Sequence, residues 1–288
     1  MTLTSFIAGI LITTVIVLRS FIVKIGTKNF SSKQITFAIA SYRVIFLIIT
    51  IPFMYDLLLP LKEINTNQYL PLLACIIKGI ILSFSLKYTA EIAKESNSSS
   101  VFAGFISLGI GAIINSFFLS EHLTYPQLFS CIALSILGVI FFFKGPACEL
   151  GKYVKKIFIL LIILSISNMM LDKIGIGGFN WYIYGMISSS VYLLNSTFFL
   201  LREKQYNCFK QLRKPILIAI GTIFTISEFT ILYSMQHFLA VSITVLFMRI
   251  ATPIIMLLSA YIYKERTPKE QFLFGILALL FALPVLFR

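Results

Sequence analysis

Charged side chains stand inside several long apolar runs of this sequence, where a charge is costly. Arg43, Lys78 and Arg249 are the deep cations, Glu228 is the deep acid, and Arg19 lies nearer the end of its run. A charge at the centre of a bilayer costs about 2.5 to 3.5 kcal/mol on insertion scales, so such residues usually face a cavity or a partner. They are therefore the candidates for binding and proton chemistry.

Lys78 and Glu228 each allow two interpretations. Lys78 lies mid-way along the run from Tyr69 to Tyr88, with about 14 Å of helix on either side at 1.5 Å per residue. Its ammonium group could hold a carboxylate or phosphate of a substrate, or form a structural pair with Glu228. An apolar cavity favours a neutral Glu228, and a nearby cation favours its carboxylate. Glu228 is therefore either a proton carrier or a permanent charge-balancing partner.

Arg249 is followed four residues later by Pro253. Because proline has no N–H, it leaves the carbonyl oxygen of residue 249 free and kinks the helix. A guanidinium and a free acceptor then share one place, which suits a zwitterionic or anionic ligand. The alternative is a kink that serves only packing, with Arg249 neutralised by Glu228.

Arg43 lies near the middle of its run and is equally consistent with a substrate contact and a structural role. Arg19 is only four residues from Val23, so we expect its side chain to extend toward Lys24 and the following loop. The deeper set then has three cations facing one acid. A cavity with that imbalance repels cationic drugs and favours substrates that carry an acidic group.

The composition indicates what kind of protein positions these residues. The chain has 288 residues and a net charge of +13, yet charged residues make up only 12% of it and apolar residues 58%. A water-soluble domain averages about 25% charged residues. These proportions exclude a nucleic-acid-binding protein, which needs a charge-rich shell for phosphates. They predict an integral multi-pass membrane protein, and the bacterial inner membrane is the expected location.

Apolar runs between the charge clusters predict ten transmembrane segments, at about 20 residues each. Backbone groups within the hydrocarbon layer must be satisfied inside each segment, so the expected fold class is all-α. The predicted segments are Leu3 to Val23, Ile35 to Leu57, Tyr69 to Tyr88, Ser98 to Leu119, Tyr125 to Phe143, Ile157 to Leu171, Phe179 to Leu201, Pro215 to Met235, Leu239 to Tyr263 and Gln271 to Phe287.

The segments divide into two blocks of five, which predicts a duplication. Residues 1–144 form the first repeat, 145–156 the connecting loop and 157–288 the second repeat. Because five is odd, tandem blocks must have opposite orientations, the inverted repeat with which many carriers build a site of alternating access. An offset of 144 residues pairs Ser98 with Ser242 and Glu121 with Glu265. Both glutamates precede helix starts, where we expect structural roles.

A family resemblance rests on the closing helix pair of each block. The stretch from Thr244 to Phe287 resembles the EamA-like branch of the drug/metabolite transporter superfamily, and Val101 to Lys144 resembles the same unit one repeat earlier. The residues that carry it are Pro253, Leu258, Lys264-Glu265-Arg266-Thr267 and Gly275, then Ser120-Glu121-His122-Leu123-Thr124 and Gly138, with Tyr42-Arg43 similar to an early arginine of that family. Gly109 departs from it, because the alignment places it opposite Pro253. The resemblance implies a carrier and leaves its substrate open.

Loop charges predict the orientation. The loops after odd-numbered segments hold most of the Lys and Arg, whereas the even loops and both termini hold only Lys62, Lys173 and Arg288. Cytoplasmic loops carry the excess of these residues, so this distribution places both termini outside. The family resemblance implies termini in the cytoplasm, and the absolute orientation stays open.

Three further patterns suggest packing, an interface and free thiols. Small residues recur every fourth position in the fourth segment and indicate close helix contact, with a polar wall of a transport path as the alternative. The cluster at Trp181, Tyr182 and Tyr184 is typical of an aromatic belt at the membrane surface. The four cysteines lack metal-ligand spacing, and we expect them to be free. The small residues are Ser99, Ala103, Ser107, Gly111 and Asn115.

These patterns predict a secondary transporter of a small polar metabolite with an acidic group, an amino acid or a related molecule. Lys78, Arg249 and Arg43 would bind the substrate, and Glu228 would carry a proton or balance charge. We expect no cofactor, no metal, no nucleic acid and no enzyme activity, in a monomer or homodimer embedded in lipid. The alternatives are a proton-coupled exporter of cationic drugs and a lipid-modifying enzyme, but the sequence has no HExxH or GxSxG signature and no P-loop.

Overall fold

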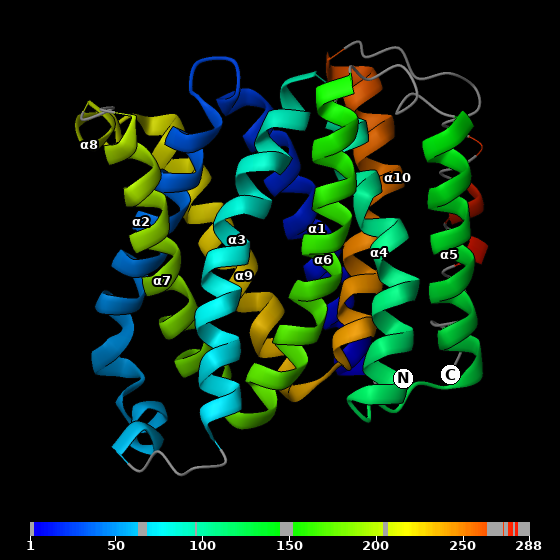
Figure 1. Cartoon of the computed structure of the whole chain (residues 1–288), viewed down its shortest axis with the longest axis horizontal. Coiled ribbons are helices and arrows are strands. Elements are labelled where there is room, and N and C mark those ends of the chain that lie inside the picture. The colour runs from blue at the N-terminus through cyan, green and yellow to red at the C-terminus, as the bar shows by residue number, and fades with distance from the viewer. Residues whose placement is uncertain are drawn as a thin grey trace.

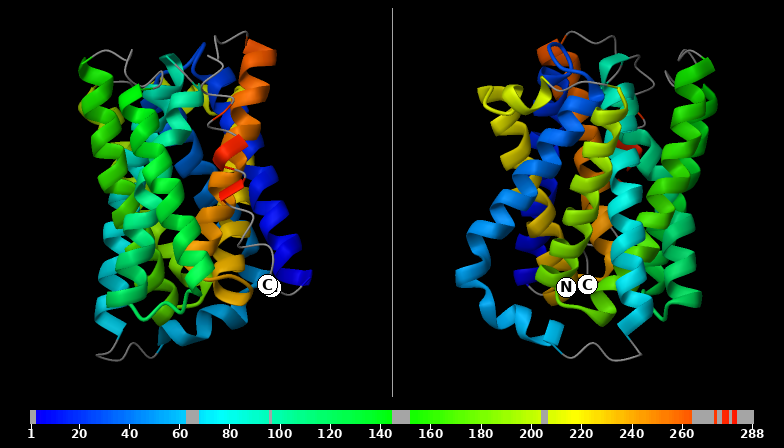
Figure 2. Two further views of the ribbon diagram at one scale, coloured as in Figure 1. Left: turned by 90° about the vertical axis from the view of Figure 1, so that its right-hand side faces the viewer. Right: turned by 60° about the vertical axis from the view of Figure 1, so that its left-hand side comes forward.

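The computed structural model is helical throughout the residues it describes, which are 3–62, 68–95, 97–144, 152–203, 207–263, 273, 276–278 and 280–281. Figure 1 shows the helices side by side, and Figure 2 shows from two further directions that the long ones follow one common axis. The helices are α1 (Leu3–Gly26), α2 (Ser32–Thr50), α3 (Tyr69–Glu95), α4 (Asn97–Phe118), α5 (Tyr125–Lys144), α6 (Lys152–Gly178), α7 (Trp181–Arg202), α8 (Cys208–Gln211), α9 (Pro215–His237) and α10 (Val241–Tyr263), with 3₁₀ turns at Ile51–Phe53 and Tyr55–Lys62.

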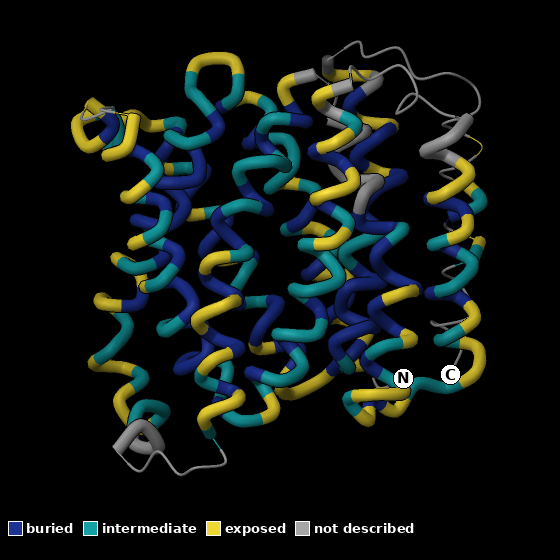
Figure 3. The backbone as a smooth tube through the Cα atoms, in the orientation of Figure 1, coloured by how far each residue is buried: buried dark blue, intermediate teal, exposed yellow. Residues whose placement is uncertain are grey.

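Seven of the described helices are long and apolar enough to cross a membrane, and two shorter apolar helices accompany them, Gly104–Phe118 and Tyr125–Ile140. Large apolar side chains cover much of the outer surface, among them Leu194 and Ile48, which are 71% and 61% exposed. Figure 3 shows the exposed positions on the outward helix faces and the buried ones in the interior. An exposed apolar surface of this kind is that of a multi-pass membrane protein. The long apolar helices confirm the predicted all-α class. The tenth predicted segment lies mostly outside the described residues.

Helix contacts define the arrangement of the bundle. α3 packs against α6 and α7, and α9 packs against α1 and α2. α4 packs against α5, α6 and α10, while α1 also contacts α10 and α2 also contacts α7. Apart from α4 with α5, each of these contacts joins a helix of the first half of the chain to a helix of the second half. The interior of the bundle is therefore shared by both halves.

Glycines bring some helices unusually close together. A Cβ atom added at Gly79 on α3 would lie 2.5 Å from the backbone oxygen of Ser188 on α7. One added at Gly111 on α4 would lie 2.5 Å from the sulfur of Met169 on α6. Ser107 and Asn115, on the same ridge as Gly111, are fully buried. The small-residue ridge of α4 therefore packs against a neighbouring helix, as its pattern indicates.

Several helices are longer than the apolar runs that predict them. α6 runs from Lys152 to Gly178, so it extends into the predicted connecting loop 145–156 and passes beyond Leu171. α3 continues seven residues past Tyr88, to Glu95. Charged residues at helix ends can reach the membrane surface, so a helix need not stop where its apolar run stops. The short helix α8 lies in a stretch predicted as loop.

The turn between α4 and α5 carries a cap for a distant helix. Ser120 has φ 51°, a left-handed conformation that reverses the chain after α4. The next residue, Glu121, is buried, and its carboxylate accepts hydrogen bonds from the Ser242 backbone N–H at 3.0 Å and from the Ser242 hydroxyl at 2.5 Å. Glu121 thus satisfies donors in the first turn of α10. This is the structural role expected for it, and Glu265 lies outside the described residues.

Candidate functional site

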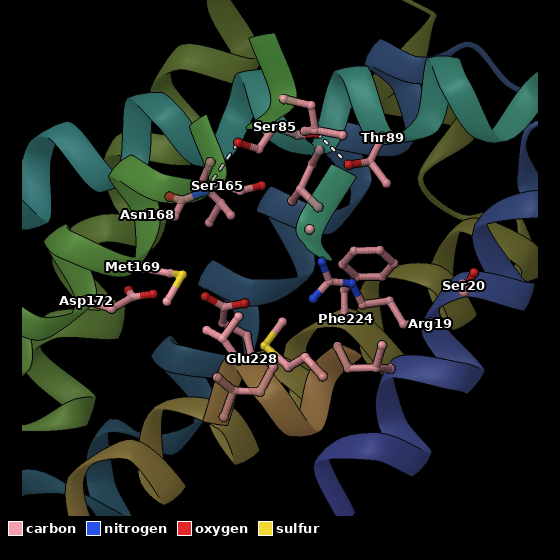
Figure 4. A pocket seen from close by; sticks show the side chains of 18 of the residues that line it. Arg19, Ser20, Ser85, Thr89, Ser165, Asn168, Met169, Asp172, Phe224 and Glu228 are labelled. Atoms are coloured by element: carbon pink, nitrogen blue, oxygen red, sulfur yellow. Dashed lines mark hydrogen bonds between the residues drawn. The ribbon is translucent and has the colours of Figure 1, made fainter. Parts of the chain in front are cut away.

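A cavity of about 170 Å³ lies inside the bundle, lined by residues of α1, α3, α4, α6, α9 and α10. Figure 4 shows polar and charged side chains entering it from several helices among apolar neighbours. Its lining residues extend from Val23 and Ala93, close to the ends of α1 and α3, to Met235, close to the end of α9. Because α9 runs antiparallel to α1 and α3, the cavity spans most of the length of the bundle.

The structure brings three of the predicted site residues to this cavity. Lys78 on α3, Glu228 on α9 and Arg249 on α10 all line it. Arg43 on α2 lies behind Glu228 and is 1% exposed, and Pro253 lies within α10, four residues after Arg249. Residues from both halves of the chain therefore meet in one place.

Lys78 is held by an acid that the sequence analysis overlooked. Its Nζ atom lies 2.7 Å from Oδ1 and 2.9 Å from Oδ2 of Asp172 on α6. The hydroxyl of Tyr184 on α7 donates to the same Oδ1 at 2.6 Å. The Tyr184 ring fits against Gly175, where an added Cβ would lie 2.1 Å from the ring. The three side chains form a buried hydrogen-bonded network between α3, α6 and α7.

This network corrects two expectations. Lys78 pairs with Asp172 and not with Glu228, so the balance of three deep cations against one acid was wrong. Asp172 was missed because the predicted segment ended at Leu171, one residue too early. The aromatic cluster was also misjudged in part, since Tyr182 and Tyr184 are buried and hydrogen-bonded inside the bundle and do not form a surface belt.

Glu228 faces Arg43, but the two groups interact loosely. Arg43 Nη2 lies 3.6 Å from Glu228 Oε1, and the Arg43 guanidinium lies 5.6 Å from the centre of the Tyr192 ring. The Glu228 carboxylate accepts no hydrogen bond from a described residue, and its side chain is 13% exposed and lines the cavity. The Glu228 carboxylate is therefore balanced from behind by Arg43 and open to the cavity in front.

Arg249 has no acidic partner among the described residues. Its guanidinium lies against Gly104 of α4, where an added Cβ would come within 1.7 Å of Cζ. Its buried Nε atom has no hydrogen-bond acceptor. An unpaired guanidinium is costly in an apolar interior. Arg249 is thus a candidate to meet an anion that enters the cavity.

Arg19 lines the cavity and does not extend to the membrane surface as expected. Its guanidinium lies over the Phe224 ring, 4.3 Å from the ring centre, and Figure 4 shows the side chain directed inward. α1 continues for seven residues beyond Arg19, to Gly26. That distance, about 10 Å of helix, favours the nearer cavity over the helix end. No ion pair joins Arg19 to a described acid within 4.0 Å.

Uncharged polar groups complete the wall between α3 and α6. Asn168 donates to the Ser85 hydroxyl at 3.3 Å, and the Asn168 side-chain oxygen is buried with no donor among the described residues. Ser165 lines the cavity one helical turn before Asn168, and Thr89 lies one turn beyond Ser85. Asn168 thus adds a polar group to this wall of the cavity.

Polar contacts join the helices at the end of the bundle that carries the basic loops. Lys24 Nζ donates to the carbonyl oxygen of Ala93 at 2.8 Å and links α1 to α3. Glu91 on α3 accepts from Ser32 on α2 and from the Tyr153 hydroxyl on α6. The negative charge of Glu91 raises the pKa of the Tyr153 phenol above its usual value, so Tyr153 stays a neutral donor. These contacts hold four helices together beside the cavity.

The remaining predictions have simple outcomes. Cys75, Cys131 and Cys208 are free and buried, as expected, and Cys148 lies outside the described residues. Burial raises the pKa of the Cys208 thiol, which makes it a weak nucleophile at neutral pH.

No protein-family model matches the sequence, and no curated protein matches it at a significant level.

Proposed function

We propose that this chain is a secondary transporter that moves a small polar metabolite carrying an acidic group, such as an amino acid, by alternating access. The observation that carries the proposal is a cavity inside a membrane bundle with two arginines, Arg19 and Arg249, that form no ion pair with a described acid. Their positive charge favours an anionic or zwitterionic ligand. Membership of the drug/metabolite transporter superfamily, in its EamA-like branch, belongs to the same proposal.

The helix contacts support an inverted repeat. Exchanging α1 with α6, α2 with α7, α3 with α9 and α4 with α10 relates the two halves of the chain. This exchange converts the α3–α6 contact into α9–α1, the α3–α7 contact into α9–α2 and the α4–α6 contact into α10–α1, and the bundle contains every one of these pairs. Two equivalent halves around a central cavity are what a carrier needs to open alternately to each side.

The size and charge of the cavity favour a metabolite over a drug. Its volume of about 170 Å³ is below the roughly 300 to 1,000 Å³ of pockets for drug-sized ligands. Lys78 and Arg43 already face acids, so their pairs add no net charge, whereas Arg19 and Arg249 remain positive. The positive charge of these two arginines repels a lipophilic cation. The cation-exporter alternative is therefore disfavoured.

Glu228 is the proposed charge-balancing or proton-carrying group. Its carboxylate is open to the cavity and has one loose partner, so ligand binding can change its environment more than that of the firmly bonded Asp172. Coupling would then use an ion gradient or exchange. In vesicles, Glu228→Gln should remove the dependence of transport on a pH gradient.

The experiment is uptake of radiolabelled amino acids by proteoliposomes. Arg249→Gln should reduce uptake at least tenfold, because it removes the unpaired guanidinium, and Arg249→Lys should restore only part of it, because lysine lacks the fork. Lys87→Gln is the matched control, since Lys87 has a partly exposed partner at 3.9 Å, Glu91, away from the arginines. Equal uptake by folded Arg249→Gln and wild-type protein would refute the proposed role of Arg249.

A further inference from the structure

Arg249 occupies a recess that only a glycine can provide. An added Cβ at Gly104 would lie 1.7 Å from Cζ, 2.0 Å from Nη1 and 2.2 Å from Nη2 of Arg249, so the flat guanidinium rests on the bare backbone of α4. This contact fixes the plane of the guanidinium but supplies no acceptor. Gly104 and Arg249 both line the cavity. The sequence analysis gave Gly104 no role.

Arg19 is fixed in a comparable way by an aromatic ring. Its guanidinium stacks on Phe224 at 4.3 Å from the ring centre, a favourable cation–π contact that also leaves the N–H donors free at their edges. Arg19 lies on α1 and Arg249 on α10, and these two helices pack against each other. Two oriented guanidinium groups therefore border one cavity, and neither forms an ion pair with an acid in the described part of the chain.

A carboxylate faces the same space. Figure 4 shows the Glu228 and Arg19 side chains directed into the cavity from different sides. One oxygen of Glu228 lies 3.6 Å from Arg43, and no described residue donates to the other. The cavity thus has fixed donors on one side and a free acceptor on another. Its remaining walls are largely apolar and include Leu82, Leu86 and Leu232.

We propose that Arg19 and Arg249, seated on Phe224 and Gly104, form a subsite for the carboxylate of an apolar α-amino acid whose ammonium group binds Glu228. Guanidinium groups bind carboxylates through paired N–H donors. The ammonium group supplies the donors that Glu228 lacks, and the apolar walls accept the side chain. This assignment names the substrate class of the proposed transport site, and binding itself can be tested without transport.

The first test measures binding to the purified full-length protein by calorimetry. The probes are L-leucine, isopentylamine, which lacks the carboxylate, and 4-methylpentanoate, which lacks the ammonium group. L-leucine should bind at least tenfold more tightly than either analogue, because each analogue leaves one side of the site unpaired. Equal binding of isopentylamine would overturn the arginine subsite, equal binding of 4-methylpentanoate would overturn the role of Glu228, and no binding of L-leucine would overturn both.

The second test changes the seat of Arg249 and keeps both arginines. Gly104→Ala should displace the guanidinium and weaken L-leucine binding about tenfold, with folding preserved because the clash is with the end of a flexible side chain. Gly177→Ala is the matched control, since an added Cβ there meets nothing within 4 Å. Unchanged L-leucine affinity in folded Gly104→Ala would overturn the subsite.

A chemical readout keeps the test independent of variants. Phenylglyoxal modifies accessible arginines, and mass spectrometry identifies the sites. Arg19 and Arg249 should react, L-leucine should protect both, and the buried Arg43 should remain unmodified. Lack of protection at saturating L-leucine would contradict the proposal. Protein that binds L-leucine in this way but does not move it across vesicles would refute transport alone, whereas transport of L-leucine without protection would refute the subsite alone.

Discussion

At the scale of single residues, the cavity contains one closed charge network and one open set of charges. Asp172 accepts from Lys78 and from Tyr184 at 2.6 to 2.9 Å, and the Asp172 oxygen that they share has no capacity left for a ligand. Arg19, Arg249 and Glu228 lack such bonding. Closed networks stabilise one arrangement, whereas open groups are available to bind. We therefore assign fixing the bundle to the first set and ligand recognition to the second.

Breaking the closed network should destabilise the protein. Asp172→Asn removes the charge that balances Lys78 and should lower the free energy of unfolding by about 3 to 5 kcal/mol, the usual cost of leaving a buried partner unpaired. The measurement is unfolding of the purified protein in mixed micelles as the SDS fraction rises.

Two controls distinguish burial from charge alone. The double variant Lys78→Met with Asp172→Leu should have a free energy of unfolding closer to that of the wild type than Asp172→Asn has, because the double variant leaves no unpaired charge. Lys87→Met breaks a partly exposed pair with Glu91 and should cost about 1 kcal/mol or less. If Asp172→Asn were as stable as Lys87→Met, the network would not have the role given to it.

The depth of four charges could be predicted from the sequence, but their partners, the inward position of Arg19 and the buried Asp172 could not. Arg43, Lys78, Glu228 and Arg249 stand far from any charge cluster, which was enough to identify them as buried. Which acid neutralises which cation depends on the packing of helices that are distant in sequence, such as α3 against α6. Asp172 could have been found by extending its helix past the apolar run, since the residues that follow, through Gly178, include no proline.

At the scale of the elements, the start of α10 depends on a residue from another helix pair. Glu121 reaches Ser242 from the turn after α4, so it connects the two halves of the chain. Glu121→Ala should reduce stability by about 0.5 to 2 kcal/mol, the range measured for the loss of a helix cap. The measurement is the same unfolding assay in mixed micelles.

A double-mutant cycle identifies the cap. Ser242→Ala removes the hydroxyl donor and keeps the backbone donor, so it should cost less than Glu121→Ala. The double variant should cost less than the sum of the two single changes, because they share one hydrogen bond. Additive losses would show that Glu121 and Ser242 do not act together.

Most helices could be predicted from apolar runs, while their ends could not. The apolar length of a run reports the hydrocarbon layer, and helices such as α3 and α6 continue into the polar surface layer. The left-handed residue Ser120 carries no strong sequence signal, yet it sets the turn that aims Glu121. The recess at Gly104 is likewise visible only when α4 and α10 are packed together.

At the scale of the whole molecule, the proposed inverted repeat makes a prediction for the tenth segment. Gly138 on α5 lies close to Ile106 on α4, with 3.0 Å from an added Cβ to Ile106 Cγ1. The offset of 144 residues maps this pair onto Ile250 and Ala282. In a cysteine-free background, Ile250→Cys with Ala282→Cys should therefore form a disulfide on mild oxidation, as the control Ile106→Cys with Gly138→Cys should.

The disulfide is detected as a shift of the protein band in gel electrophoresis after oxidation, which a reductant reverses. A disulfide in the control but none at 250 and 282 would contradict the repeat.

The relation between the halves could be inferred from the sequence only through segment count and a few matched positions, because many sequences satisfy the same helix packing. The equivalent contacts of α3 and α9 provide the stronger support.

We propose that the cavity carries small molecules with an acidic group across a membrane. The most direct measurement loads proteoliposomes with a ¹³C-labelled mixture of metabolites and follows, by mass spectrometry, which compounds leave. Wild-type protein should release amino acids or related small acids, and Arg249→Gln should slow this release at least tenfold. Release of cationic compounds alone, or no difference between protein-containing and empty vesicles, would contradict it.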